Sequence, residues 1–163
     1  MKRLFVIRHA KSSWKDLSLA DHERPLNKRG KRNIPDMARH LAAQYDGVDT
    51  FISSHAVRAH ETAKGIAAAF HYATKDIKIA PDLYHAGTIQ ILTVVKSIPD
   101  EHDSAAIFGH NPGFTEFIND MTDSDIFNIP TCGVAVIHLP IDTWKKAAFM
   151  TNELALYTYP KAL

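Results

Sequence analysis

The chain begins with an apolar strand that ends abruptly in two basic side chains. Residues 4–7 are Leu, Phe, Val and Ile, and Arg8 and His9 follow directly. A continuous apolar run of this kind is typical of a strand in a parallel sheet that is buried on both faces. Open α/β sheets bind their ligands at the carboxyl ends of their strands, so Arg8 and His9 predict an anion-binding site there.

The composition is that of an ordinary soluble globular protein. Of the 163 residues, 45% are hydrophobic and 23% are charged. This length is typical of one domain, and we expect a single domain over residues 1–163. Lys and Arg number 19 against 18 Asp and Glu, for a net charge of +1. Because nucleic-acid binding depends on a basic surface, this balance argues against a nucleic-acid partner and makes any anion site local.

The single cysteine and the absence of long apolar segments bear on where the protein works. Cys132 can form no disulfide within the chain, which suits a reducing compartment, and it offers no thiolate cluster for zinc. The chain enters its first strand without a signal-type apolar segment, and it contains no run of 18 apolar residues. We therefore expect a cytoplasmic protein with no membrane partner. The sequence does not reveal the oligomeric state, and we expect a monomer.

Segments typical of strands and of helices alternate along the chain. The expected helices cover residues 28–45, 56–70, 89–97 and a stretch that begins near residue 112. The expected strands are the first one and residues 50–53, 77–79, 104–108 and 133–139, with one or two more within 146–157. This alternation predicts an α/β fold of three layers, α/β/α, whose mainly parallel central sheet includes an antiparallel strand near the end.

Several element boundaries are marked by capping residues and prolines. Asn27 is the expected N-cap of the first helix, and Pro35 either kinks that helix or begins its main body. Asn111 is the expected N-cap of a later helix, with Pro112 at the first helical position. Residues 11–25 are polar and show no regular period, so we expect a loop that can close over the end of the first strand.

Three strand ends carry basic groups. Arg8 and His9 end the first strand, Arg58 lies just after the strand 50–53, and His110 follows the strand 104–108. In a parallel sheet these ends lie at one edge. Two guanidiniums and two imidazoles that meet there would bind a group with about two negative charges and three acceptor oxygens, so a phosphoryl group is the expected ligand.

Three segments, in this order, resemble the signature of a known family. Arg8-His9-Ala10 is similar to the Arg-His-Gly signature of the histidine phosphatase superfamily, with Ala in place of Gly. Residues 53–63 are similar to its Ser-Ser/Pro…Arg-Ala…Thr-Ala segment, and residues 109–112 to its second-histidine segment. Within the superfamily, the short length and residues 23–30 resemble the small SixA-type phosphohistidine phosphatases. The resemblance implies a phosphoglycerate mutase-like fold.

The resemblance also implies roles for the four basic residues. His9 would be the nucleophile that forms a phosphohistidine intermediate, and Arg8, Arg58 and His110 would bind the phosphoryl oxygens. A nucleophilic imidazole must be neutral, whereas an imidazole that binds oxygens is better as a double donor, so we expect His110 to gain its proton when phosphate binds. The helix that follows His110 would add amide donors to the anion. No metal or other cofactor is implied, because the guanidiniums take the part that Mg²⁺ plays elsewhere.

Further residues have a functional and a structural interpretation. Arg24 either reaches the pocket from the loop or forms a surface ion pair. Ser12 and Asn111 are candidates for substrate binding, although capping and turn formation also explain them. A basic cluster in the first helix is either a solvated helix face or a surface for an acidic partner protein; it consists of Lys28, Arg29, Lys31 and Arg32.

The proton donor is not assigned by the sequence. Larger members of the superfamily carry an acidic residue after the arginine-containing helix, and the corresponding segment here, residues 81–87, contains no Glu. Asp82, Tyr84, His85 or no residue at all is left as the general acid. An alkoxide leaving group needs a proton donor. The imidazole that leaves from a phosphoramidate depends less on such a donor.

The missing acid favours one of three functions. The leading hypothesis is hydrolysis of phosphohistidine on a protein such as a histidine-containing phosphotransfer domain, because the chain also has little room for the insertion that covers the pocket in larger relatives. The alternatives are a broad-specificity small-molecule phosphomonoesterase and a non-catalytic module that binds phosphoproteins. Retention of His9 disfavours the last, because a pure binder needs cations but no nucleophile.

Overall fold

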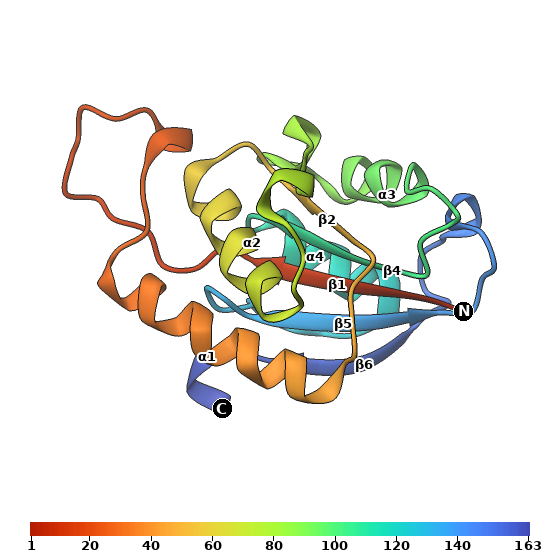
Figure 1. The fold of residues 1–163 in the computed structure, drawn as a ribbon. Helices are drawn as coiled ribbons and strands as arrows, with labels where there is room; N and C mark the ends of the chain where they lie inside the picture. The colour runs from red at the N-terminus through yellow and green to blue at the C-terminus, as the bar shows by residue number, and fades with distance from the viewer.

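The protein is built on one six-stranded sheet. The computed structural model describes residues 1–163 and orders the strands β3-β2-β4-β1-β5-β6, with the helices on either side (Figure 1). The strands are β1 (Lys2–Arg8), β2 (Thr50–Ser53), β3 (Lys78–Ile79), β4 (Ser104–Gly109), β5 (Val134–Leu139) and β6 (Glu153–Thr158). The predicted α/β architecture with a mainly parallel sheet is confirmed.

The register of the parallel strands brings three strand ends together. Arg8 at the end of β1 pairs with Gly109 of β4, and Ser53 at the end of β2 pairs with Phe108 of β4. The residues that follow these strands therefore lie at one edge of the sheet. On the far side of β1, β5 runs antiparallel to both β1 and β6, as predicted for the end of the chain.

Helices cover both faces of the sheet. α1 (Lys28–Gln44) and α2 (Val57–Ala69) cover one face, and α3 (Thr88–Lys96) and α4 (Gly113–Thr122) cover the other. Side chains of a strand alternate between the two faces, so Phe5 and Ile7 join a buried cluster of 19 residues while Leu4 and Val6 join one of 21 residues. The three-layer prediction is confirmed.

Two helix starts were predicted from caps, with different outcomes. The Asn27 side chain accepts a hydrogen bond from the Gly30 amide at 2.8 Å, and Pro35 lies inside a continuous α1. The later helix begins at Gly113 rather than at Pro112. Pro112 takes the N-cap position, and the Asn111 side chain accepts from the Thr115 amide at 3.2 Å, so it caps the helix from one residue further out.

The last predicted strand segment is shorter than expected. Residues 146–157 contain one strand, which begins only at Glu153, and Trp144 lies in a short 3-10 turn before it. The Trp144 side chain is fully buried, and its indole N–H donates to the His102 carbonyl at 2.8 Å. No helix of the fold has the length and apolar character needed to cross a membrane.

The start of α4 gives a test of the packing. A Cβ at Gly113 would overlap the backbone carbonyl oxygen of Ala86, whereas a Cβ at Gly47 would meet nothing within 4 Å. Helix propensity alone predicts that Gly113→Ala stabilises the protein by about 1 kcal/mol. Because the obstacle is backbone, we expect it instead to lower the free energy of unfolding by about 1–3 kcal/mol in urea denaturation.

Gly47→Ala is the matched control, and we expect its free energy of unfolding to stay within about 0.5 kcal/mol of the wild type. A Gly113→Ala protein as stable as the wild type would show that the loop before α3 does not pack against α4 in this way.

Candidate active site

The four basic residues predicted to meet at the sheet edge do so. Arg8 ends β1, His9 follows it, Arg58 lies in the first turn of α2, and His110 follows β4. His9, Arg58 and His110 are almost completely buried, at 7%, 3% and 4% exposure. The two imidazole ring centres are 5.1 Å apart, and Nε of Arg58 lies 3.4 Å from Nε2 of His9.

His9 is held in one orientation by its own backbone neighbour. Its Nδ1 lies 2.8 Å from the Ala10 carbonyl oxygen, which makes Nδ1 the protonated nitrogen and leaves the Nε2 lone pair on the side of Arg58. Burial, and then the charges of Arg58 and Arg8, lower the pKa of His9 to about 3. At neutral pH the imidazole is therefore neutral, with Nε2 able to act as a nucleophile.

His110 is also held neutral. Its Nε2 lies 2.7 Å from Oγ of Ser54, and its Nδ1 is buried without a partner. Burial lowers the pKa of His110 to about 2, with further contributions from His9 and Arg58. The expected gain of a proton on phosphate binding stays a prediction.

Asn111 holds the segment before β5 against Arg8. Its Nδ2 donates to Oδ1 of Asn128 at 2.7 Å and to the Ile129 carbonyl at 3.0 Å, and Arg8 donates to the same carbonyl at 2.9 Å. With Oδ1 capping α4, the Asn111 amide is fully used inside the protein. This arrangement favours the structural interpretation of Asn111.

The predicted amide donors at the start of α4 are largely occupied. The Phe114 amide donates to the His110 carbonyl at 3.0 Å, and the Thr115 amide donates to the Asn111 side chain. The expectation that this helix end offers its amides to an anion is wrong for these two groups, because the His110 carbonyl and the Asn111 side chain already accept from them.

Arg24 reaches the pocket edge and also forms an ion pair. It is 7% exposed, donates to Oγ of Ser12 at 2.8 Å, and contacts Asp21 at 3.2 Å. Its guanidinium lies 3.6 Å from the centre of the Trp14 ring. Arg24 is near enough to contribute to the lowered pKa of His9. The ion pair of Arg24 is observed, and Ser12 orients its guanidinium; a role of Arg24 and Ser12 in substrate binding stays a prediction.

Asp21 was not identified by the sequence analysis. Its carboxylate accepts from Nη2 of Arg58 at 2.9 Å and from the Tyr84 hydroxyl, and its backbone oxygen accepts from Nη1 of Arg58 at 2.7 Å. Burial raises the pKa of Asp21, but the hydrogen bonds from Tyr84 and Arg58 outweigh this and hold it well below the usual range. The only available signal was its place in a loop predicted to close over the strand end.

Of the three candidate proton donors, two lie at the pocket. The Tyr84 and His85 rings are centred 5.2 Å and 5.9 Å from the His110 ring. Burial and the bond to Asp21 raise the pKa of Tyr84, so its hydroxyl keeps its proton at neutral pH. Asp82 is exposed, and its side chain forms no hydrogen bond. No group of three His, Cys, Asp or Glu side chains is arranged to hold a metal ion.

Comparison with known proteins identifies the family. The sequence pattern of the histidine phosphatase superfamily (branch 1) matches residues 4–116, which include all four basic residues of the pocket. The chain belongs to the histidine phosphatase superfamily. An uncharacterized chloroplastic protein of Arabidopsis thaliana is 29% identical over 154 residues, which cover 90% of this chain and 70% of that protein.

Solved structures of superfamily phosphatases share the fold. The crystal structure of a SixA protein from Agrobacterium tumefaciens, named as a candidate phosphohistidine phosphatase, superposes with a TM-score of 0.83 at 25% identity and 98% coverage of both chains. The protein histidine phosphatase SixA in complex with tungstate has a TM-score of 0.76 at 17% identity, with 93% of this chain and 96% of that chain covered. The chain is thus a SixA-like member of the superfamily.

The buried neutral histidines predict a pH-dependent stability. The folded-state pKa values of His9 and His110, about 3 and about 2, lie below the value of about 6.5 for an exposed histidine. Below pH ~6.5 the unfolded chain takes up protons that the folded protein does not, so the free energy of unfolding falls as the pH falls. Each histidine contributes a slope of about 1.4 kcal/mol per pH unit once the pH is well below 6.5.

Urea denaturation between pH 7 and pH 5 measures this slope. His110→Asn should lower the slope by the contribution of one histidine, about 1.4 kcal/mol per pH unit. Asp21 does not interfere, because a carboxyl with a lowered pKa loses its contribution only below pH ~4. A slope that His110→Asn leaves unchanged would show that His110 is not buried in its neutral form.

Proposed function

We propose that this protein is a phosphatase that hydrolyses phosphohistidine on other proteins through a phospho-His9 intermediate. The observation that supports it most is the approach of Nε of Arg58 to Nε2 of His9, at 3.4 Å, in a buried cluster that also contains His110 and has Arg8 beside it. A neutral imidazole nitrogen surrounded by cationic donors fits the transfer of a dianionic phosphoryl group. Residues 1–163 form one catalytic domain in this proposal.

In the first step, Nε2 of His9 attacks phosphorus in line with the leaving group. The distal ring nitrogen of the substrate imidazole takes a proton from solvent, and the bond from phosphorus to this ring breaks as the bond to His9 forms, so the substrate leaves as a neutral imidazole while His9 keeps its Nδ1 proton. Arg8, Arg58 and His110 stabilise charge on the equatorial oxygens. Positioning and electrostatics supply the catalysis, and no metal is needed in this mechanism.

In the second step, water attacks phospho-His9, which releases phosphate and returns the neutral imidazole.

Asp21 acts as a positioning residue, because it holds Arg58 by both Nη atoms and leaves Nε directed at His9. Its low pKa keeps it ionised and unsuited to donate a proton. A site whose carboxylate is ionised suits a leaving group that makes little demand on an acid.

Exposed apolar side chains near the pocket support a protein substrate. Trp14 and Leu17 lie on the loop that carries Arg24, with 64% and 86% exposure. Phe127 is fully exposed on the segment that binds Arg8 through Ile129. Exposed apolar side chains on these two segments offer contacts to a protein that presents its phosphohistidine to His9. The one buried free cysteine, Cys132, fits the cytoplasm, and we propose that the protein works there as a monomer.

A small-molecule phosphomonoesterase is the second candidate, and one observation favours it. The Tyr84 hydroxyl keeps its proton at neutral pH and lies at the pocket, so it is able to protonate an alkoxide. A non-catalytic binding module has no use for the neutral, oriented imidazole of His9.

Three substrates separate these functions. We expect the wild type to hydrolyse a histidine phosphotransfer domain phosphorylated with phosphoramidate at least tenfold more efficiently than a sugar phosphate or para-nitrophenyl phosphate. His9→Ala should reduce all turnover to background. Preference for the sugar phosphate would contradict the substrate class, and turnover that survives in His9→Ala would contradict the nucleophile.

Asp21→Asn tests the positioning of Arg58. Loss of a negative charge beside the pocket should tighten the binding of inorganic phosphate, while loss of the hold on Arg58 should lower kcat roughly tenfold. Isothermal titration and steady-state kinetics measure the two effects. Asp82→Asn is the matched control and should change neither, because Asp82 is exposed and unbonded. A fall in affinity together with unchanged kcat would refute the positioning role.

A further inference from the structure

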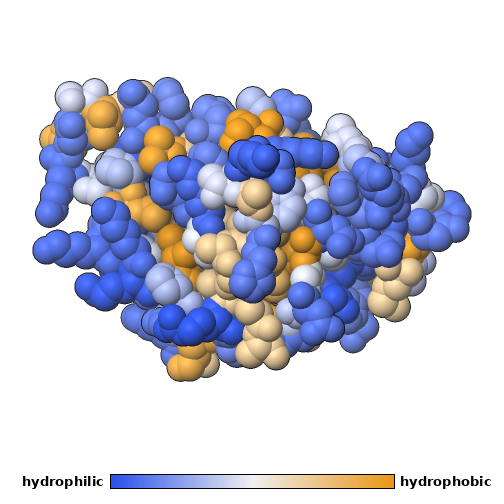
Figure 2. Space-filling view, in the orientation of Figure 1, coloured by the Kyte–Doolittle hydropathy of each residue, from blue (hydrophilic) through white to orange (hydrophobic).

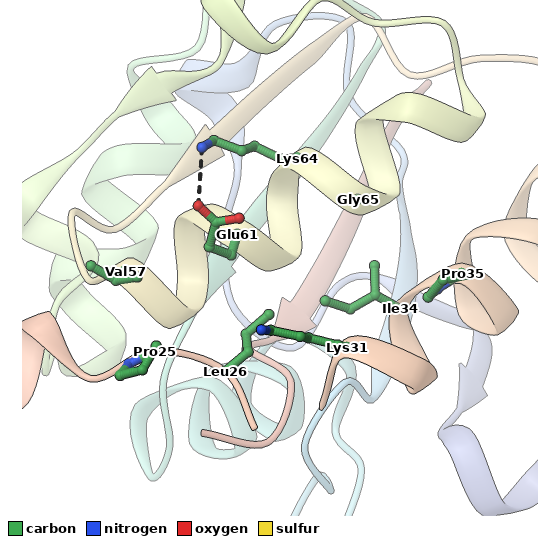
Figure 3. Close-up of a pocket in the computed structure, with 9 residues that line it drawn as sticks. All are labelled: Pro25, Leu26, Lys31, Ile34, Pro35, Val57, Glu61, Lys64 and Gly65. Atoms are coloured by element: carbon green, nitrogen blue, oxygen red, sulfur yellow. Dashed lines mark hydrogen bonds and ion pairs between the residues drawn. The ribbon is translucent and has the colours of Figure 1, made fainter. Parts of the chain in front are cut away.

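A groove of about 620 Å³ runs between α1 and α2. Its apolar lining includes Leu26 and Ile34, which are buried, and Val57, which is 37% exposed (Figure 3). A Cβ at Gly65 would overlap Ile34, so the two helices touch there and the groove opens beyond that contact. Apolar surface is visible between α1 and α2 among hydrophilic side chains in Figure 2. A volume of this size is within the range of binding sites.

Two residues that line the groove are chain neighbours of arginines at the candidate active site. Pro25, at one end of the groove, directly follows Arg24, and Val57 directly precedes Arg58. The Pro25 carbonyl accepts from the Ser13 amide at 2.8 Å, which fixes this end to the loop over the pocket. A polypeptide that presents a side chain to His9 would therefore bring its neighbouring residues to the groove.

The rim of the groove carries unpaired positive charge. Nζ of Lys64 lies 3.0 Å from Oε1 of Glu61, so these two side chains form an ion pair. Lys31, whose side chain lies across Leu26 in Figure 3, has no carboxylate within ion-pair distance. The other basic residues of the first turns of α1 are exposed and also lack an ion pair; they are Lys28, Arg29 and Arg32.

The stability of α1 does not explain these charges. The first turn of α1 contains no acidic residue, and its cations lie at the positive end of the helix dipole. A cation at that end costs about 0.3–1 kcal/mol, and neighbouring like charges add to the cost. Four basic residues that oppose the dipole without an internal partner are suited to carboxylates supplied from outside.

We propose that this groove docks the segment flanking the phosphohistidine of the substrate protein. That segment places an apolar side chain against Leu26, Ile34 and Val57, and it sets a carboxylate against Lys31. The proposal rests on the phosphohistidine phosphatase function proposed above and adds the chemistry of the partner, which is acidic and apolar at this surface. Binding outside the pocket gives selectivity for a protein without any change in the phosphoryl site.

Lys31→Glu tests the docking, with Lys75→Glu as a matched control for the same charge reversal at an exposed lysine outside the groove. With a histidine phosphotransfer domain phosphorylated by phosphoramidate, we expect Lys31→Glu to raise KM about tenfold and to leave kcat within about twofold. Hydrolysis of para-nitrophenyl phosphate should be unchanged in both variants. The Tm of Lys31→Glu should not fall, because Glu suits the start of a helix.

The possible failures are distinguishable. If the wild type hydrolyses the phosphorylated domain and Lys31→Glu matches it in KM, the groove is not the docking site, and the proposed function stands. If Lys31→Glu loses activity on para-nitrophenyl phosphate as well, Lys31 acts through the pocket and the docking proposal is overturned. If the wild type hydrolyses para-nitrophenyl phosphate but not the phosphorylated domain, the proposed function fails, and the docking proposal with it.

Discussion

Burial of several basic groups in one pocket is the constraint on which the rest of the site depends. Like charges in a desolvated space repel one another strongly, and each loses hydration as well. The protein meets this cost in two ways: His9 and His110 are held neutral, and the carboxylate of Asp21 is set against Arg58. The outcome is a positive pocket that contains one oriented imidazole nitrogen, and this is the combination that a phosphoryl acceptor requires.

The four basic residues could be predicted from the sequence because each directly follows an apolar strand or begins the next helix. Parallel pairing then brings the strand ends together, so local pattern and topology were sufficient. Asp21 could not be predicted in this way. It lies in a loop without a regular period, and its contact with Arg58 joins residues 37 positions apart. The late start of β6 was missed as well, because the chain before it forms a short 3-10 turn at Trp144–Lys146 instead of continuing as a strand.

The same distinction applies to the substrate. The basic cluster of α1 is visible in the sequence, but its position beside an apolar groove appears only when α1 packs against α2 at Gly65. The ionised Asp21 and the groove next to Arg24 and Arg58 both favour the proposed substrate, a phosphohistidine on a protein. The first suits a leaving group that needs little acid catalysis, and the second suits a substrate larger than a metabolite.

The most direct test is to trap phosphate on His9. The enzyme is mixed with a phosphorylated histidine phosphotransfer domain, the reaction is stopped in base within the first turnover, and the peptides are mapped by mass spectrometry. The account predicts one added phosphate on His9 that is labile in acid and absent from His9→Ala. Phosphate on another residue of the wild type during active turnover would contradict it.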